Sequence, residues 1–269
     1  MKVFAIHDDE IDIKNSIGYL FHYERSNSFV IELVNTLDEW NAPLLFSTLV
    51  KRGVYTIPKD IAMLWVQERV IPSGRQNIGL ILKNSKMAKY SEGKLLALSQ
   101  GKSSQDACYV KKIDVKDLPD WVIQRQKSNI FEAFPIVDNR IVCLQNNDYA
   151  IAVDLEKCLD QVPKLYTVLS DERLMSTLKV EAGGYGVCFN DSISVDKDTL
   201  INNGVVLPIY ARVFTDFANH SVINTTEACT ILNCSRQNLA YFIKNKILHP
   251  IKESWKENVF LRGELTSMD

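Results

Sequence analysis

The sequence lacks the spacings that would place it in a chemical class directly. It has four histidines and six cysteines in 269 residues, no Cys-x-x-Cys pair, and no histidine at ligand spacing from a cysteine. Zinc sites and disulfide frameworks depend on such spacings, so we expect reduced, mostly buried thiols and no metal. No Ser/His/Asp, Cys/His or paired-carboxylate arrangement stands out either. We therefore expect neither catalytic residues nor a cofactor.

Charge and hydropathy are also unbiased. There are 31 Lys and Arg residues against 33 Asp and Glu, for a formal net charge of −2, and the mean hydropathy is −0.08. This balance excludes a basic arm protein and an acidic disordered chain. No segment approaches the roughly 18 consecutive apolar residues of a membrane helix, and Met1–Asp9 turns acidic too early for a secretory signal. We expect a soluble, cytoplasmic protein without membrane contact.

Residues 1–118 are expected to form an N-terminal α+β domain of unassigned role. Lys2–Ile6 and Phe29–Val34 have the β-branched and aromatic residues of strands. Helical spacing follows Pro43 and Pro58 and recurs over 77–84 and 91–99. The acidic run Ile6–Glu10 is similar to the acidic pair of phospho-receiver domains. No aspartate ends the later strand Phe29–Val34, however, so an acidic loop is favoured.

After a polar connector over 112–129, residues 130–204 are expected to form a small β-rich α+β domain. Arg140–Leu144 and Tyr149–Leu155 are predicted to pair as a hairpin, because Gln145–Asp148 has residue types that tolerate left-handed backbone angles. A glycine turn at 183–184 and a short helix over 196–201 follow. Four aspartates of this region could be catalytic or metal-binding residues: Asp154, Asp191, Asp196 and Asp198. Each adjoins a turn or a helix start, where aspartate commonly caps the backbone, and this structural role is favoured.

Two runs in this region carry a family resemblance. They are Val153-Asp154-Leu155 and the segment from Gly184 to Leu200, in which Phe189 stands where the family usually has tryptophan. In order and spacing they resemble a small bacterial domain of unknown function that is often encoded in toxin–antitoxin-like pairs. The resemblance implies a fold and no reaction.

After a linker over 205–220, residues 221–269 show two short amphipathic helices with a tight break. Thr225 can cap the first helix, with Glu227 at its second position. Asn233 and Cys234 interrupt the pattern, and Ser235 can cap a second helix whose Leu239, Phe242 and Ile243 face inward. Two such helices favour a helix-turn-helix.

The polar residues of this segment are of the types that contact DNA. Arg236, Gln237 and Asn238 would lead the second helix into a major groove. A hairpin with arms 247–251 and 258–261 would bring lysines to a phosphate backbone. Between residues 226 and 256 we count five basic residues against two acidic ones. The candidate DNA-binding residues are Thr226, Ser235, Arg236, Gln237, Asn238, Tyr241, Lys244, Lys252 and Lys256.

The run from Thr225 to Ser235 and the step from Asn245 to Lys252 resemble the winged helix-turn-helix of excisionase and MerR-type regulators. At the glycine of the family's step this sequence has Asn245 or Lys246, and Asn245 could adopt the positive φ expected there. The resemblance covers about 45 of the 269 residues and implies double-stranded DNA as a partner. The family's arginine-rich wing is missing, and the alternative is a helical pair used only for packing or dimerisation.

Together these patterns predict a multidomain α+β protein that ends in a winged helix-turn-helix. Its predicted function is DNA-binding transcriptional regulation, with the upstream domains binding a partner or forming a homodimer. A second hypothesis is an antitoxin-like protein that sequesters a cognate protein and represses its own operon. A third is an enzyme within residues 1–115 with a DNA-targeting tail, for which the sequence offers no catalytic set.

Overall fold

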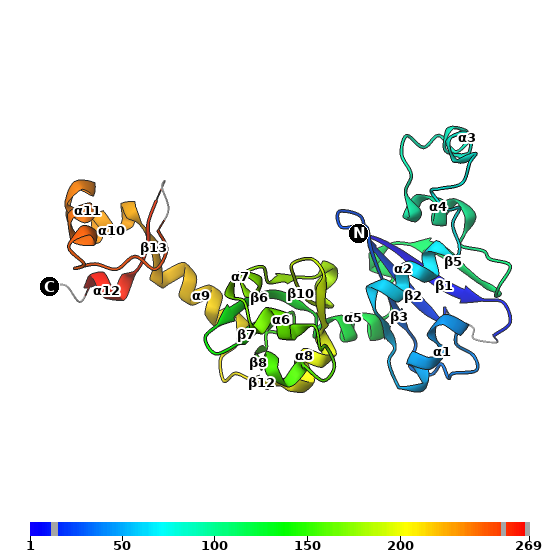
Figure 1. Ribbon diagram of the computed structural model, residues 1–269, viewed down its shortest axis with the longest axis horizontal. Coiled ribbons are helices and arrows are strands. Elements are labelled where there is room, and N and C mark those ends of the chain that lie inside the picture. Colours follow the sequence, from blue (N-terminus) through cyan, green and yellow to red (C-terminus); the bar gives the residue numbers. More distant parts are fainter. Residues whose placement is uncertain (12–15, 254–256, 267–269) are drawn as a thin grey trace.

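The computed structural model describes residues 1–11, 16–253 and 257–266 and has an α+β fold. All strand pairs in the described chain are antiparallel. Its main hydrophobic cores follow one another along the sequence, which defines an N-terminal unit (2–126), a middle unit (130–206) and a C-terminal unit (222–266). Figure 1 shows the three units in a row. No helix among the described residues has the length and apolarity to cross a bilayer.

The N-terminal unit is built on a five-stranded sheet in the order β4-β3-β2-β1-β5. Its strands are β1 (Lys2–Asp8), β2 (Gly18–Tyr23), β3 (Ser28–Leu33), β4 (Thr56–Ile57) and β5 (Cys108–Ile113). The helices are α1 (Leu44–Lys51), α2 (Lys59–Gln67), α3 (Ile78–Asn84), α4 (Glu92–Ser99) and α5 (Asp120–Gln126), with a 3-10 turn at Val115–Asp117. Phe46 of α1 and Trp65 of α2 pack on one face of the sheet, and Val122 of α5 packs on the other.

Local signals predicted several of these elements. Pro43 and Pro58 directly precede α1 and α2, as the fixed φ of proline favours. The strands β2 and β5 were not predicted, and they flank β1 on its two sides. An antiparallel sheet in this order differs from the parallel sheet of a doubly wound receiver. The expectation of an acidic loop over Ile6–Glu10 holds only for Asp9 and Glu10, because β1 extends to Asp8.

The middle unit contains a four-stranded sheet in the order β12-β8-β7-β6 and a three-stranded sheet in the order β11-β10-β9. The strands are β6 (Ile130–Ile136), β7 (Arg140–Gln145), β8 (Ala150–Asp154), β9 (Lys179–Val180), β10 (Gly186–Phe189), β11 (Ile193–Asp196) and β12 (Gly204–Val206). The helices are α6 (Leu165–Leu169), α7 (Glu172–Met175) and α8 (Lys197–Asn203), with 3-10 turns at Leu155–Cys158 and Ala182–Gly184. The predicted hairpin is confirmed by the pairing of β7 with β8.

The aspartates of the middle unit mostly serve local structure. Asp154 accepts a hydrogen bond at 3.1 Å from the backbone of Glu156 and caps the first 3-10 turn. Asp196 caps α8 by accepting the backbone N–H of Thr199 at 2.8 Å, and Asp191 forms an exposed ion pair. Among the described residues, no group of three or more potential metal ligands converges.

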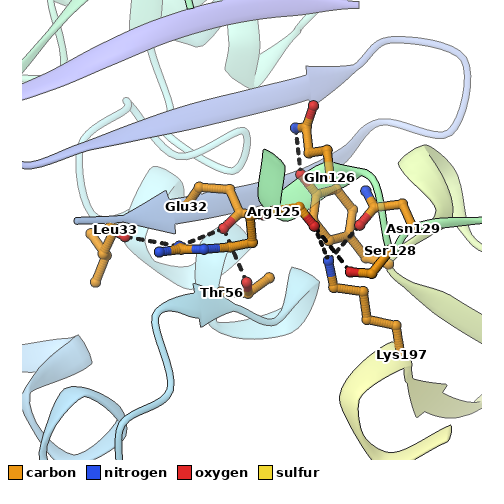
Figure 2. Close-up of polar contacts among 9 residues, drawn as sticks. Glu32, Leu33, Thr56, Arg125, Gln126, Ser128, Asn129 and Lys197 are labelled. Carbon is orange, nitrogen blue, oxygen red and sulfur yellow. Dashed lines mark hydrogen bonds and ion pairs between the residues drawn. The ribbon is translucent and has the colours of Figure 1, made fainter. Parts of the chain in front are cut away.

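A buried polar cluster joins the N-terminal and middle units through α5 (Figure 2). The Arg125 guanidinium donates to Glu32 of β3 at 2.7 Å, and Glu32 is fully buried. On the middle unit, the ammonium of Lys197 donates to the Arg125 carbonyl at 3.1 Å and also contacts the Asn129 side-chain oxygen. Burial lowers the pKa of Lys197, although the carboxylate of Glu32 opposes that shift. The segment expected to be a polar connector therefore includes part of the interface between the units.

The segment 205–220, expected to be a linker, begins within β12 and continues as α9 (Ala211–Ser221). β12 pairs with β8, and Ala211 is buried against the sheet of the middle unit. The C-terminal unit follows directly, with β13 (Val222–Asn224), α10 (Thr225–Ile231), α11 (Arg236–Lys244), β14 (Val259–Leu261) and α12 (Arg262–Thr266). At the same junction Arg262 Nε donates to the His220 carbonyl at 2.9 Å, so α9 is tied to the unit that it precedes.

Candidate nucleic-acid interface

The start of α10 is fixed by a reciprocal cap. The Asn224 side chain accepts the backbone N–H of Glu227 at 2.9 Å, and the Glu227 carboxylate accepts the backbone N–H of Asn224 at 2.9 Å. The prediction that Thr225 caps this helix, with Glu227 at its second position, was wrong. The Thr225 hydroxyl instead exchanges hydrogen bonds with the backbone of Asn258, at 3.1 and 3.0 Å. The spacing Asn-x-x-Glu is the signal for a capping box, and Asn224 could have been found from it.

The predicted break between the two helices has a defined geometry. Asn233 adopts a φ of +46°, and its N–H donates to the Thr230 carbonyl at 3.3 Å. The next N–H, of Cys234, donates to the Cys229 carbonyl at 3.0 Å. This pair of bonds is the Schellman ending of a helix, and asparagine tolerates the left-handed conformation that it requires. Burial and the adjacent Cys229 thiol raise the pKa of Cys234.

The second helix, α11, begins at the predicted cap. The Ser235 hydroxyl accepts the backbone N–H of Asn238 at 3.2 Å. Leu239 is buried in the core of the C-terminal unit, and Phe242 and Ile243 are partly buried against it. The apolar stripe predicted from the sequence therefore faces α10 and the two short strands.

The opposite face of α11 carries the polar residues singled out in the sequence, and all of them are exposed. They are Arg236, Gln237, Asn238, Tyr241 and Lys244, with Thr226 and Ser235 exposed beside them. The Arg236 guanidinium donates to the Thr226 hydroxyl of α10 at 3.0 Å. The side chain at the leading end of α11 is therefore oriented by the preceding helix, and its remaining donors are available to a ligand.

Beyond α11 the chain makes the step at which a positive φ was expected. Lys246, not Asn245, adopts it, with a φ of +57°, whereas Asn245 has a φ of −89°. The N–H of Lys246 donates to the Ile243 carbonyl at 3.0 Å, and that of Ile247 to the Phe242 carbonyl at 2.9 Å. A second Schellman ending therefore places the left-handed residue one position past the cap.

Among the described residues, one bridge of the hairpin expected over 247–261 forms, between Lys252 and Val259. All three residues of β14 pair with β13, from Val222↔Leu261 to Asn224↔Val259. Pairing with β13 buries Phe260 in the core, which a detached hairpin would leave exposed. Lys252 is exposed, and Lys256 lies outside the described residues.

No protein-family model matches this chain, and no curated protein or solved structure shows significant similarity to it.

Proposed function

We propose that this protein is a cytoplasmic DNA-binding transcriptional regulator whose C-terminal unit acts as a winged helix-turn-helix. The observation that carries the proposal is the exposed polar face of α11, on a helix capped at Ser235 and closed by a Schellman ending. Arginine, glutamine and asparagine have the donors and acceptors that read base edges in a major groove. The N-terminal residues of a recognition helix are the ones that reach those edges.

In this proposal Arg236 and Gln237 contact bases, and Asn238, Tyr241 and Lys244 extend the contact along the groove. Thr226 orients Arg236 through their hydrogen bond of 3.0 Å. Ser235 lies where the start of α11 meets the phosphate backbone, and Lys252 contacts a phosphate from the strand side. Lys256, outside the described residues, is a further phosphate contact proposed from the sequence alone. The upstream units bind a partner or form a homodimer, because paired copies read the paired half-sites of an operator.

The test is a titration of the full-length protein against its own upstream DNA and a scrambled duplex, at two salt concentrations. We expect tighter binding to its own DNA, weakened by salt. Arg236→Ala and Gln237→Ala should each cost about 1–3 kcal/mol of specific binding. Lys164→Ala, an exposed lysine on the middle unit, is the matched control. Equal affinity for both duplexes, or unchanged binding by both α11 variants, would contradict the proposal.

A second candidate function is that of an antitoxin-like protein that sequesters a cognate protein and represses its own operon. It is favoured by large apolar side chains that remain exposed where β12 meets α9: Val205, Val206, Tyr210, Val213 and Phe217. Co-expression with the neighbouring reading frame, followed by size-exclusion chromatography, tests it. A heterocomplex that Val213→Glu disrupts supports this function, whereas the chain eluting without the co-expressed protein contradicts it.

A further inference from the structure

Residues 72–89 form a lobe that stands apart from the sheet of the N-terminal unit (Figure 1). The lobe contains α3 and is closed at its base by a hydrogen bond of 2.8 Å from the Tyr90 hydroxyl to the Ile71 carbonyl. The exit from α3 is fixed by Lys86, which has a φ of +52°, the left-handed conformation that ends a helix. None of the residues of the lobe is buried, so the lobe is an ordered projection with two sides open to a partner.

The helix of the lobe is rich in aliphatic residues, although it lies at the surface. Leu80 of α3 is 66% exposed, and Leu98 of the neighbouring α4 is 61% exposed. A helix of this composition is normally covered by other parts of a protein, and exposed apolar patches mark interaction sites. Four of the seven residues of α3 are large aliphatic side chains, none of them buried: Ile78, Leu80, Ile81 and Leu82.

A cavity of about 260 Å³ lies between α3, α4 and the chain segment that leads into the lobe. Ser85 and Ser99 add hydroxyl groups to its wall, and Arg69, also on the wall, is paired with Asp106. The cavity therefore suits an inserted apolar side chain better than a charged one. Its wall is mainly aliphatic, formed by Val70, Ile71, Ile81, Leu95 and Leu98.

The lobe is also strongly basic. Its four cations are all exposed, and so is Lys94, which lies one helical turn before Leu98 on α4. None of these five side chains forms an ion pair within the described chain. Glu92, the nearest acidic residue along the chain, accepts a hydrogen bond from the Asn27 side chain at 3.1 Å. The lobe has no acidic residue of its own, in a chain whose formal net charge is −2, and its cations are Arg75, Lys83, Lys86 and Lys89.

We infer that the lobe and α4 form a docking surface for an acidic amphipathic helix of a partner protein. The apolar side chains of such a helix, spaced at i, i+3, i+4 and i+7, fill the aliphatic cavity and cover Leu80 and Leu98. Its carboxylates pair with the unpaired lysines around the cavity. A nucleic acid would pair with the same lysines and leave the cavity unfilled. The inference goes beyond the proposed function, because it requires neither DNA binding nor the exposed residues where β12 meets α9.

Fluorescence anisotropy with the full-length protein tests the inference. The probe is a labelled peptide of two Glu-Leu-Glu-Glu-Leu-Leu-Glu heptads, which has one apolar and one acidic face when it is helical. One control peptide replaces every glutamate by lysine, and a second replaces every leucine by serine. We expect the acidic amphipathic peptide to bind at least tenfold more tightly than either control, and its affinity to fall as salt is added.

Substitutions locate the binding on this surface. The double variant Lys83→Glu/Lys94→Glu should weaken the acidic peptide at least tenfold, and Leu98→Ser should weaken it at least threefold; all three positions are exposed. The matched control is Lys157→Glu/Lys164→Glu, which makes the same change of charge at exposed positions of the middle unit. It should leave the affinity within twofold of that of the native chain.

Several results would overturn the inference. They are no binding of the acidic peptide at submillimolar protein, equal binding of the serine peptide, and equal effects of the two double variants. If the acidic peptide does not bind, Lys83→Glu/Lys94→Glu identifies the other occupants. Loss of binding to phosphatidylglycerol vesicles or to a random-sequence duplex in that variant would assign the surface to a lipid or a nucleic acid. Loss of self-association would assign it to a second copy of the chain.

Discussion

Arg125 on α5 and Glu32 on β3 form an ion pair of 2.7 Å in which the carboxylate is fully buried. Both partners have further bonds, because Arg125 donates to the Leu33 carbonyl at 2.9 Å and Glu32 accepts the Thr56 hydroxyl at 3.0 Å. A buried charge is costly unless it is paired. The contact between the sheet of the N-terminal unit and α5 therefore depends on both side chains being present.

Arg125→Ala should destabilise the fold by about 3–5 kcal/mol, because it leaves the buried carboxylate of Glu32 unpaired. The double variant Glu32→Gln/Arg125→Met should recover much of that loss, since neither charge then remains. Urea unfolding, monitored by circular dichroism, measures the unfolding free energy of both variants. Lys179→Ala breaks an exposed pair with Asp191 and should cost less than about 1 kcal/mol. Equal losses for the two single variants would refute the buried-pair argument.

Acidification should destabilise the N-terminal unit through His22. This ring is buried and stacked on Phe29 at 4.3 Å, and burial lowers its pKa below the ordinary 6.5. As pH falls below 6.5, the unfolded chain takes up a proton that the folded ring resists, so stability falls. Unfolding free energies at pH 7.5 and pH 5.5 should differ less in His22→Gln than in the native chain. Burial lowers the pKa of His7 as well, so His7→Gln is measured in the same way to show how much of the pH difference comes from His7. An unchanged pH difference in His22→Gln would exclude His22 as the cause.

Lys246→Gly should stabilise the C-terminal unit by about 1 kcal/mol. Lys246 holds a φ of +57°, which costs a residue with a Cβ about 1–2 kcal/mol and glycine little. Ala240→Gly, at an exposed position inside α11, should instead destabilise by about 1 kcal/mol. Thermal melts of the two variants should shift in opposite directions, and a lower melting temperature for Lys246→Gly would contradict the role of this position.

Lys252→Ala should weaken DNA binding to a similar degree for every sequence. A phosphate contact carries no base information, but it releases counterions, so its loss should reduce the slope of log affinity against log salt by about 0.9. The measurement is affinity for specific and scrambled duplexes over a range of salt. A loss confined to the specific duplex would instead assign Lys252 to base recognition.

Thr226→Val should show how much of the DNA affinity depends on the orientation of the Arg236 side chain, as distinct from its presence. The variant removes the hydroxyl that accepts the guanidinium at 3.0 Å and keeps the volume of the side chain. Specific affinity should fall by less than in Arg236→Ala, and the double variant should match Arg236→Ala alone, because the two residues act in series. Additive losses would show that Thr226 contacts DNA independently.

Local chemistry predicted the parts of the fold that depend on neighbours in sequence. Pro43 and Pro58 directly precede α1 and α2, and Ser235 caps α11 as expected. The assignment of the cap to Thr225 failed because its hydroxyl bonds to Asn258, more than thirty residues away. The ion pair of Arg125 with Glu32 was equally hidden, because it joins residues 93 positions apart.

The same distinction between local and distant contacts applies to the candidate site. The residues of α11 were found because a helix repeats its faces locally and leaves Arg236 and Gln237 off the apolar stripe. The hydrogen bond from Arg236 to Thr226 was not found, because it joins two helices and depends on how they pack against each other.

The pairing of β1 with β5 also sets an order of events during synthesis. β1 is an inner strand of its sheet, between β2 and the edge strand β5, so one of its two edges stays unpaired until residues 108–113 leave the ribosome. At about 5–20 residues per second, that edge waits roughly 5–20 s, while the hairpin of β2 and β3 can form early on the other side. An exposed strand edge invites pairing with another chain. The nascent N-terminal unit is therefore most vulnerable to aggregation before the last of its strands arrives.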